Sequence, residues 1–387
     1  MDDVPAGPAS PGPRRPSLSV VVPVRNGGAV LEHCLLRLRN STWTDFELIV
    51  VDDGSSDSSG DLARRMGAVV VDHERPLGPA AARNRGAQIA RAPIIFFLDA
   101  DVAVHPDAVA RGMARFLAQP GLTAVFGSYD DRPAAPGIPS QFRNLLHHFV
   151  HQQGAFVDDA RRAHTFWTGC GLIRRETFLE FGGFDPLLYP RPAIEDIELG
   201  YRLTRAGHTI LLARDIQGTH HKRWSLTGMI RTDIFCRGVP WMLLLKRSGT
   251  EETDLNVSPA QRISVALTAV VLLGLPASTL STAATAVTLL ALAAIVGINQ
   301  AFYRFLLERR GAAFAAASLP WPLRYFTCCG LSVMIALFQW HILRPLSAST
   351  ARRAARRDGV FHRAESIPRP FLTRLSGRLS RWTSRSR

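Results

Sequence analysis

The segment that most constrains the fold of this chain runs from position 94 to position 101, with the sequence IIFFLDAD. Five apolar residues, four of them β-branched or aromatic, lead directly into two carboxylates separated by one alanine. This pattern is typical of a strand that is buried on both faces of a parallel sheet. Because ligands of open α/β sheets bind at the carboxyl ends of the strands, Asp99 and Asp101 are candidate ligands of a divalent cation that neutralises a diphosphate. On its own, the segment is equally consistent with a strand followed by a solvated turn.

Segments of strand character alternate with segments of helical periodicity through the first third of the chain. Residues with the periodicity of a helix follow the turn at Asn26, the polar stretch around Ser58 and the proline at position 106. A further helix is expected over 80–90. This alternation predicts an α/β fold built on a doubly wound, mostly parallel sheet. The strands are expected at positions 17–24, 46–51, 68–71, 94–98 and 123–126.

The alternation ends after the fifth expected strand. A proline-rich loop precedes an expected helix over 141–153, which carries three histidines. His147, His148 and His151 could bind a metal ion, but the aromatic residue among them fits an exposed or groove-lining helix about as well. An amphipathic helix is then expected over 193–207, with its acidic residues in the first turn, where the helix dipole favours them.

The formal net charge of +14 is concentrated at the end of the chain. Positions 352–387 hold eleven arginines and only two acidic residues. Because apolar segments precede this stretch, its nearest anionic partner is the headgroup layer of a membrane, and no nucleic acid partner is expected.

The first sixteen residues contain five prolines and no apolar core, so they predict a disordered leader rather than a signal peptide. The five cysteines show no metal-ligand spacing, which is consistent with a reducing cytosolic environment.

Two apolar regions predict membrane-spanning helices. No charged residue occurs over the 36 residues from 263 to 298, which is enough for two helices with a turn near 276–282, since one span needs about 20 residues. The arginines that follow, Arg304, Arg309 and Arg310, would mark the cytosolic side.

The second apolar region, 312–343, is interrupted by two prolines and Arg324. One full span over 325–343 would place the basic tail outside the cytosol. A re-entrant pair or two short spans would keep the tail inside, which the positive-inside rule favours.

The chain therefore divides into five expected parts. Positions 225–246 mix aromatic, basic and apolar side chains and predict a helix that lies in the membrane interface. The parts are a disordered leader over 1–16, an α/β domain over 17–225, an interfacial region over 226–260, a transmembrane region of two to four spans over 261–345 and a basic disordered tail over 346–387.

Acidic residues follow three of the expected strands and should meet at one edge of the sheet. Asp52 and Asp53 follow the second strand and Asp72 follows the third. One of the paired carboxylates can accept a hydrogen bond from the ring N–H of a nucleotide base, and Arg83 or Arg85 can bind the phosphates. Neither Gly-x-Gly-x-x-Gly nor Gly-Lys-Ser/Thr follows the first strand, which disfavours a dinucleotide oxidoreductase and a P-loop ATPase.

Six short motifs, in this order, resemble those of the family 2 glycosyltransferases, which have the GT-A fold. The resemblance covers about positions 18–224 and implies a Rossmann-like GT-A domain that transfers a sugar from a nucleotide sugar. The motifs are SVVVPVRN at 19–26, VVDDGSSD at 50–57, ARNRG at 82–86, DAD at 99–101, GCG at 169–171 and ED at 195–196.

This resemblance implies roles for individual residues. Asp101, together with Asp99, would hold the Mg²⁺ or Mn²⁺ ion that binds the diphosphate of the donor. Asp196 would be the general base that deprotonates the acceptor hydroxyl, with Glu195 beside it. Donor binding is expected from Pro23, Arg25, Asp52, Asp53, Arg83, Asp99 and Arg223, and acceptor binding from Gly169, Cys170, Gly171 and Trp224.

The segment from His220 to Trp224 resembles only in part a Gln-x-x-Arg-Trp motif of membrane-bound, processive members of that family. This chain has histidine at position 220 where the motif has glutamine, which argues against processive synthesis. Arg223 could still contact the diphosphate, Trp224 could stack on the acceptor sugar, and either His220 or His221 could complete the metal site. A basic cluster that anchors the domain to headgroups would explain the same residues.

The sequence as a whole therefore predicts an inverting, metal-dependent glycosyltransferase. Its donor would be a nucleotide sugar, either a UDP-sugar or a GDP-sugar, and its acceptor a lipid-linked or membrane-proximal glycan. It would be a multi-pass protein of the inner or plasma membrane with a cytosolic catalytic domain, whose C-terminal helices and basic tail contact lipids.

Two alternatives remain open at this point. A sugar nucleotidyltransferase would need a longer glycine-rich loop after the first strand than positions 25–28 provide. A catalytically silent membrane scaffold would not need the acidic motifs.

Overall fold

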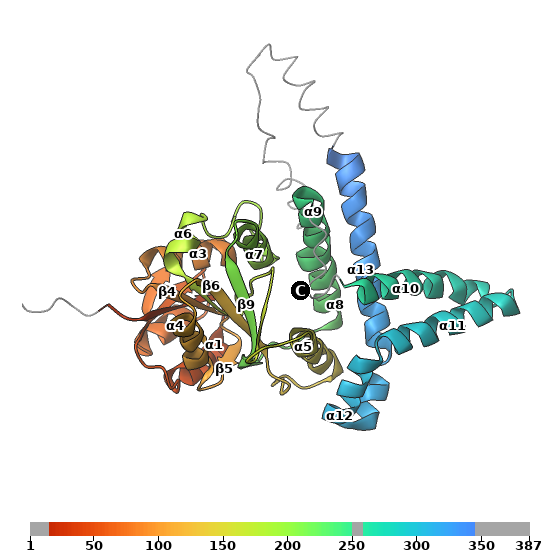
Figure 1. Cartoon of the computed structure of the whole chain (residues 1–387), viewed down its shortest axis with the longest axis horizontal. Helices are drawn as coiled ribbons and strands as arrows, with labels where there is room; N and C mark the ends of the chain where they lie inside the picture. Colours follow the sequence, from red (N-terminus) through yellow and green to blue (C-terminus); the bar gives the residue numbers. More distant parts are fainter. Residues whose placement is uncertain (1–14, 250–257, 345–387) are drawn as a thin grey trace, which may run out of the picture.

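The computed structural model describes residues 15–249 and 258–344. The expected leader and basic tail lie outside these ranges, apart from positions 15 and 16. Figure 1 shows an α/β domain followed by a group of C-terminal helices, two of which project away from the rest of the molecule.

Four strands form the parallel half of one mixed sheet. They are β1 (Leu18–Val24), β2 (Phe46–Asp52), β3 (Val69–Asp72) and β4 (Ile94–Leu98), in the order β3-β2-β1-β4. Every residue of β4 is buried, because strands flank it on both sides and apolar layers cover both faces of the sheet. The carboxyl ends of these strands meet at one edge, which places the acidic residues that follow them on the same side of the domain.

The other half of the sheet breaks the parallel pattern. β8 (Cys170–Arg174) runs antiparallel between β4 and β6 (Leu122–Tyr129), and β9 (Thr209–His220) is parallel to β6. β5 (Val102–Val104) and β7 (Ala160–Arg162) pair antiparallel with β9. The insertion of β8 beside β4 brings the segment that precedes β8 next to the Asp99–Asp101 loop.

Alternate residues of the central strands pack into two apolar layers. Val20 and Val22 lie in one layer with Leu31 and Met113, whereas Val21 lies in the other, because successive side chains of a strand point to opposite faces. The first layer contains α1 (Gly28–Arg39) and α4 (Ala108–Ala118), the second contains α3 (Pro79–Ile89), α6 (Arg175–Glu180) and α7 (Glu195–Arg205), and α2 (Ser59–Arg65) packs on β2 and β3.

The segment predicted as an interfacial helix is a nearly continuous helix of three parts. These are α8 (Leu226–Arg231), the π-helix η1 (Thr232–Gly238) and α9 (Val239–Ser248). Figure 1 shows α9 between the α/β domain and the later helix α13 (Pro320–Phe338). Trp241 of α9 donates an indole hydrogen bond to the hydroxyl of Tyr201 in α7 at 3.2 Å, while the other side of η1 and α9 contacts α13.

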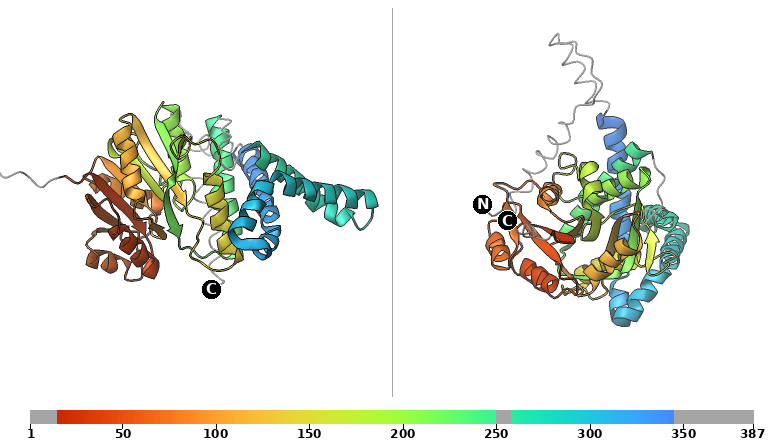
Figure 2. Two further views of the ribbon diagram at one scale, coloured as in Figure 1. Left: turned by 60° about the horizontal axis from the view of Figure 1, so that its bottom comes forward. Right: turned by 60° about the vertical axis from the view of Figure 1, so that its left-hand side comes forward.

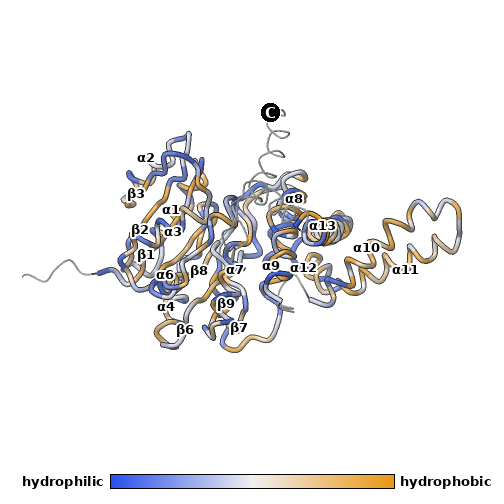
Figure 3. The backbone as a smooth tube through the Cα atoms, turned by 90° about the horizontal axis from the view of Figure 1, so that it is seen from above, coloured by the Kyte–Doolittle hydropathy of each residue, from blue (hydrophilic) through white to orange (hydrophobic). Residues whose placement is uncertain are grey.

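The helices α10 (Pro259–Ala277) and α11 (Thr282–Ile298) form a hairpin whose turn lies where the sequence predicts it. The left view of Figure 2 shows the hairpin projecting from the molecule, and Figure 3 shows that it is largely hydrophobic. After a bend of 65°, α12 (Gln300–Ala317) returns to contact α5 (Ile138–His151) of the α/β domain.

Two helices of the described ranges are long and apolar enough to cross a membrane. They are Pro259–Ala277, and Pro320–Leu343, which joins α13 to the short π-helix η3 (Gln339–Leu343). The bent pair of α11 and α12 adds a third if it is counted as one span. Figure 1 shows that α13 runs across the α10–α11 hairpin and not alongside it.

Candidate active site

Arg83 joins the two acidic pairs of the candidate site. Its side chain is buried on α3, where Nη2 donates a hydrogen bond to Asp99 Oδ1 at 2.6 Å and Nη1 donates one to Glu195 Oε1 at 2.9 Å. Asp99 follows β4 and Glu195 begins α7, so one guanidinium connects two segments that are far apart in the sequence. Both terminal nitrogens of Arg83, which the sequence predicts to bind phosphate, are thus engaged by carboxylates of the protein.

Asp196 faces the loop that precedes β8. Its Oδ2 accepts hydrogen bonds from the backbone N–H and the hydroxyl of Thr168, at 3.1 and 3.2 Å, and its Oδ1 accepts one from the N–H of Ile197 at 2.9 Å. Because Asp196 lies in the first turn of α7, the N–H groups and the dipole of the helix also favour its charged form. These contacts fix the orientation of the carboxylate.

Burial raises the pKa of both Glu195 and Asp196. For Glu195, the charge of Arg83 opposes this effect and the charge of Asp196 adds to it. For Asp196, the hydrogen bond from the Thr168 backbone and the charge of Arg83 lower the pKa, whereas the charge of Asp99 raises it, and the net shift is upward. A carboxylate with a raised pKa accepts a proton more readily than an exposed one, which is the property that a general base needs.

Asp101 lies opposite a buried histidine. His220 Nε2 is 3.4 Å from Asp101 Oδ2, and the other ring nitrogen, Nδ1, bonds to Asn144 Oδ1 at 2.6 Å. Because an amide oxygen only accepts hydrogen bonds, Nδ1 carries a proton. Nε2 then carries either a second proton or a lone pair directed at a cation, and this second arrangement is typical of histidine ligands of metals.

The charge around Asp101 favours its ionised form. Burial would raise the pKa of Asp101, but the interaction with His220, which includes a hydrogen bond, and the positive charge of Lys222 lower it further than burial raises it. The backbone N–H of His221 donates a hydrogen bond to the carbonyl oxygen of Asp101 at 2.9 Å, so β9 also holds the loop in position.

The donor set fits a cation that arrives with a phosphate ligand. Within residues 15–249 and 258–344, no three His, Cys, Asp or Glu side chains are arranged to enclose a metal ion by themselves. The protein offers the carboxylates of Asp99 and Asp101 and the imidazole of His220 as ligands. The remaining ligands of the cation would come from the phosphates of the substrate. Mg²⁺ is commonly bound by one or two carboxylates together with substrate phosphates, and Mn²⁺ accepts the same oxygen donors.

The metal interpretation of the three α5 histidines is wrong, and so is the exposed-helix alternative. His148 Nδ1 and His151 Nδ1 bond to backbone carbonyl oxygens of β6 at 2.8 and 3.2 Å, and the His147 ring packs at a tilt against those of Tyr129 and Trp167. Burial lowers the pKa of His147 and of His151, the latter to about 4, so both rings are neutral at pH 7. His147 and His151 line a groove, which was the other alternative.

Asp52 and Asp53 organise the turns beyond β2. Asp53 is buried and accepts hydrogen bonds from the backbone N–H groups of Leu77 and Gly78, both at 2.8 Å, and its Oδ1 is 2.8 Å from His73 Nδ1. Asp52 Oδ1 accepts a hydrogen bond from the N–H of Ser55 at 2.8 Å. Both carboxylates therefore hold the loops at this strand edge.

The other residues near this edge differ in exposure. Pro23 is half-buried in β1 and Arg25, just after β1, is exposed. Asp72 pairs with Arg64 at the domain surface and is not part of the Arg83 cluster.

The Gly169–Gly171 segment enters β8 beside the end of β4. Gly171 pairs with Phe97 and Cys170 pairs with Leu98. A Cβ atom at Gly169 would lie 2.2 Å from the ring of Trp167, and one at Gly171 would lie 2.3 Å from the Trp167 carbonyl oxygen. The glycines thus allow Trp167 to pack over the start of β8.

Trp224 and Arg223 lie in the connection between β9 and α8. Trp224 packs in an apolar cluster with residues of α5 and α12, and its ring lies 4.6 Å from Lys222 Nζ. Arg223 is exposed and forms no ion pair with any residue that the structure describes. Neither residue contacts Arg83.

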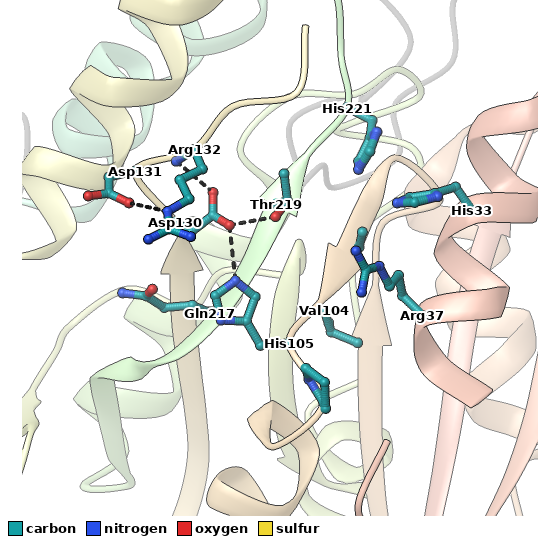
Figure 4. A pocket seen from close by; sticks show the side chains of 12 residues that line it. His33, Arg37, Val104, His105, Asp130, Asp131, Arg132, Gln217, Thr219 and His221 are labelled. Atoms are coloured by element: carbon teal, nitrogen blue, oxygen red, sulfur yellow. Dashed lines mark hydrogen bonds and ion pairs between the residues drawn. The ribbon is translucent and has the colours of Figure 1, made fainter. Parts of the chain in front are cut away.

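A cavity of about 520 Å³ lies on the β5 and β9 side of this site. Figure 4 shows His33 and Arg37 of α1 on one side of it, and Asp130 with its partners His105 and Thr219 on the other. It is connected to the candidate metal site through His221, whose ring lies 4.3 Å from that of His33.

Sequence reasoning missed several residues that shape the site. Asn144 orients His220, Tyr129 stacks on the His220 ring with a centroid distance of 4.1 Å, and Thr168 holds Asp196. A threonine immediately before the Gly169–Gly171 motif is the only signal that could have pointed to one of them. The contacts of Asn144 and Tyr129 depend on the packing of α5 against β6 and β9.

The mixed sheet is covered on both faces by helices, and acidic pairs lie at the end of β4 and at the start of α7. These features define a GT-A domain. In this chain the domain is joined to apolar helices that could cross a membrane. A family model described as "Glycosyl transferase family 2" matches residues 19–182 of the chain. The chain belongs to this family.

Individual relatives are similar over somewhat more than half of the chain. A validoxylamine A glucosyltransferase of Streptomyces hygroscopicus subsp. jinggangensis is 32% identical over 269 residues, which are 59% of this chain and 62% of that protein. An uncharacterized protein of Mycobacterium tuberculosis is 34% identical over 225 residues, or 55% of this chain and 69% of that protein. The chain thus spans less than two thirds of the length of the glucosyltransferase.

Among solved structures, a mannosyltransferase from Pyrobaculum calidifontis in complex with GDP-Man and Mn²⁺ has a similar fold. The TM-score is 0.51 at 18% identity, and the similarity covers 84% of this chain and 87% of that one. The likeness therefore extends beyond the α/β domain into the helical part.

Proposed function

We propose that this protein is an inverting, metal-dependent glycosyltransferase that moves a sugar from a nucleotide sugar to an acceptor at the membrane. The observation that carries the proposal is the Arg83 bridge, which holds the Asp99–Asp101 loop beside Glu195 and Asp196. This proximity supports a single site in which one acidic pair binds the donor and the other accepts a proton. The names of two similar proteins, a glucosyltransferase and a mannosyltransferase bound to GDP-Man and Mn²⁺, support a hexose donor.

In the proposed reaction, Asp196 takes the proton of the acceptor hydroxyl while that oxygen attacks the anomeric carbon. The bond between this carbon and the diphosphate breaks, so a nucleoside diphosphate leaves on the face opposite the acceptor and the configuration inverts. The divalent cation supplies charge neutralisation at the diphosphate when bound. Asp99, Asp101 and His220 would hold it, and Arg83 positions Asp99 and Glu195 through its two hydrogen bonds.

The donor's base and ribose would lie over the ends of β1 and β2. Pro23, Arg25, Asp52 and Asp53 are the residues available there, and the loops that Asp53 holds would form the floor of the site. On the acceptor side, the half-buried Trp167 offers a ring for stacking close to Thr168 and Asp196. Arg223 would contact the donor, and Trp224 the acceptor, only after the connection between β9 and α8 changes its conformation.

The position of α12 supports membrane association of the catalytic domain. Arg309 forms an ion pair with Asp131 at 3.0 Å, and Arg310 donates hydrogen bonds to the carbonyl oxygen of Asp131 and to Gln141 Oε1. The basic residues expected on the cytosolic side therefore contact the α/β domain itself. This supports a cytosolic catalytic domain at the inner or plasma membrane.

Donor binding is tested with the full-length protein in detergent. A panel of UDP- and GDP-hexoses is titrated by calorimetry with Mn²⁺ and again with EDTA. We expect binding that requires the cation and that weakens at least about tenfold in Asp101→Asn. Asp61→Asn, an exposed aspartate on α2, is the matched control and should bind as the wild type does.

Transfer is tested by incubating the protein with labelled donor and a membrane lipid extract. The expected products are a labelled lipid and free nucleoside diphosphate. Pyrophosphate release from a nucleoside triphosphate would instead identify a nucleotidyltransferase, and the absence of any metal-dependent donor binding would contradict the proposal.

A further inference from the structure

The cavity of about 520 Å³ beside α1, β5 and β9 has no role in the reaction proposed above. All of its lining residues lie in the continuous described range 15–249. Apolar side chains come only from Ala103, Val104 and Pro106, and every other lining side chain is polar or charged. Such a wall fits a polar ligand and not a hydrocarbon chain.

The cavity lies behind the strand that carries the candidate metal ligand His220. Thr219 and His221 line the cavity, because successive side chains of an extended segment point to opposite sides. His220, between them, faces Asp101 instead. The backbone N–H of His221 donates a hydrogen bond to the carbonyl oxygen of Asp101 at 2.9 Å. A ligand of the cavity would therefore lie next to the Asp99–Asp101 loop but outside the donor site.

The acidic residues of the cavity already have partners within the protein. Asp130 is buried, accepts a hydrogen bond from the hydroxyl of Thr219 at 2.5 Å and lies 3.0 Å from His105 Nε2. Asp131 forms an ion pair with Arg309 at 3.0 Å. Both carboxylates lie across the cavity from α1, as Figure 4 shows, and they do not neutralise the α1 side.

The α1 side of the cavity is basic. His33 and Arg37 are four positions apart, so they share one face of α1, and Figure 4 shows both beside the cavity. The guanidinium of Arg37 forms no hydrogen bond or ion pair with any residue in the ranges 15–249 and 258–344. Its charge is therefore available to an anion in the cavity, and a guanidinium binds phosphate through two parallel hydrogen bonds.

His221 is a second, independent indication of a ligand. Its Nε2 atom is buried and has no hydrogen-bond partner among the described residues, and its ring lies 4.3 Å from that of His33. A buried polar atom without a partner is costly, and an oxygen-rich ligand would supply the missing partner. Gln217 Nε2 donates to the carbonyl oxygen of Arg214 at 2.9 Å, so the Gln217 amide oxygen remains as an acceptor for a ligand hydroxyl.

We propose that this cavity binds a small hydroxylated molecule that carries a phosphate group, of the sugar phosphate class. The phosphate would lie at Arg37 and His221, and the hydroxyl groups would face Gln217 and Asp131. The unbalanced charge of α1 demands an anion. The size of the cavity demands more than a phosphate ion, since a water molecule occupies only about 30 Å³ of liquid. The site is distinct from the donor and acceptor sites and does not rest on the proposed function.

The test measures binding of glucose 6-phosphate to the full-length protein in a non-ionic detergent, by calorimetry. EDTA is present, because it removes the cation that a phosphate would need at Asp99 and Asp101. Inorganic phosphate and glucose are titrated in parallel. The variants are Arg37→Gln and Arg37→Lys, with Arg39→Gln as the matched control, since Arg39 is exposed in the same last turn of α1 but lies outside the cavity.

We expect glucose 6-phosphate to bind the wild type and Arg39→Gln equally. Its affinity should fall at least about tenfold in Arg37→Gln and recover in part in Arg37→Lys, because a hydrogen bond between two charged groups contributes more than a neutral one. Inorganic phosphate and glucose should each bind at least about tenfold more weakly than glucose 6-phosphate. The two single-feature ligands thereby show whether the cavity requires both the charge and the hydroxyl groups.

Equal affinity of glucose 6-phosphate for the wild type and Arg37→Gln would overturn the proposal. Inorganic phosphate that binds as tightly as glucose 6-phosphate would also overturn it, because the site would then hold a simple anion. If Arg37→Gln does not fold, Arg37→Lys and the three ligands on the wild type still decide the question. The titrations contain EDTA, so a failure of metal-dependent donor binding would refute the glycosyltransferase function and leave this site standing.

Discussion

At the scale of single residues, the strongest expectation concerns Asp196. Asp196→Asn keeps the shape of the side chain and its contacts with Thr168 but removes the proton acceptor. We expect transfer to fall by about 10²- to 10⁴-fold, while the affinity for the nucleotide sugar remains near that of the wild type. Asp107→Asn, at an exposed aspartate before α4, should leave both quantities unchanged. Turnover of Asp196→Asn at the wild-type rate would remove Asp196 from the mechanism.

The raised pKa of Asp196 predicts a pH dependence. Only the ionised carboxylate can accept the proton, so kcat/KM should rise with pH through an inflection above the ordinary value of 3.8. Thr168→Val removes the hydroxyl that donates to Asp196 Oδ2 at 3.2 Å. Because that hydrogen bond favours the charged form, its loss should shift the inflection to higher pH.

Thr204→Val, on the same helix as Asp196 but bonded only to helix carbonyl oxygens, is the control for this pH profile. The profile of Thr204→Val should match that of the wild type. An inflection in Thr168→Val at or below the wild-type position would contradict the assignment.

Arg83 supports a prediction about stability. Arg83→Gln leaves Asp99, Glu195 and Asp196 close together without their shared cation, which should cost about 3–5 kcal/mol of unfolding free energy. The exposed Arg85, two positions away on α3, is the matched control, and Arg85→Gln should cost less than about 0.5 kcal/mol. Thermal unfolding in detergent compares the two variants. A similar melting temperature for both would mean that Arg83 does not bind the acidic pairs together.

The acidic residues of the site could be predicted from the sequence, because a buried strand pattern places the residues after it at a sheet edge. The Arg83 bridge could not, since it depends on α7 and α3 meeting in space. The same holds for Asn144 and Tyr129, which reach His220 only through the packing of α5. For the α5 histidines the sequence left metal binding open, and burial against β6 decided against it.

At the scale of elements, the strands that alternate regularly with helices were predictable and the later strands were not. β1, β2 and β4 are rich in β-branched or aromatic residues, most of which are buried. β8 contains Gly171, against which Trp167 packs, and β9 contains Gly218 together with the charged residues Arg214 and Asp215. These strands pair with their neighbours in an antiparallel direction or through a crossover connection. The periodicity within a single segment does not predict such pairing.

Close packing of η1 and α9 on α13 depends on Gly238. A Cβ atom there would lie 2.1 Å from Ser332 Oγ and 2.8 Å from the carbonyl oxygen of Asp233. Gly238→Ala should therefore push α13 away and destabilise the protein by about 1–3 kcal/mol. Gly297→Ala, in α11, has no atom within 4 Å and should be neutral or slightly stabilising. Melting temperatures in detergent compare the variants, and equal values would show that this contact is loose.

At the scale of the whole molecule, the crossed arrangement of α13 and the hairpin restricts how the protein can sit in a membrane. Figure 1 shows α13 running across the hairpin, so the two cannot both be parallel to one membrane normal. α10 begins and α11 ends near Asn299, whose side chain donates a hydrogen bond to Ser264 Oγ at 3.0 Å, and α12 then returns to the α/β domain. We propose that the hairpin crosses the membrane and that α13, although long and apolar enough to cross it, lies in the interface together with η1 and α9.

This orientation places the hairpin tip on the side of the membrane opposite the catalytic domain. α10 has 19 residues, or about 28 Å of helix, which nearly equals the thickness of the hydrocarbon core. Leu280, at the tip, is 89% exposed, and Leu117, on α4 of the α/β domain, is 73% exposed. In intact cells, a membrane-impermeant maleimide should label Leu280→Cys and not Leu117→Cys, whereas both should react after permeabilisation. Protection of Leu280→Cys in intact cells, with labelling after permeabilisation, would mean that the hairpin re-enters and that α13 is the crossing helix.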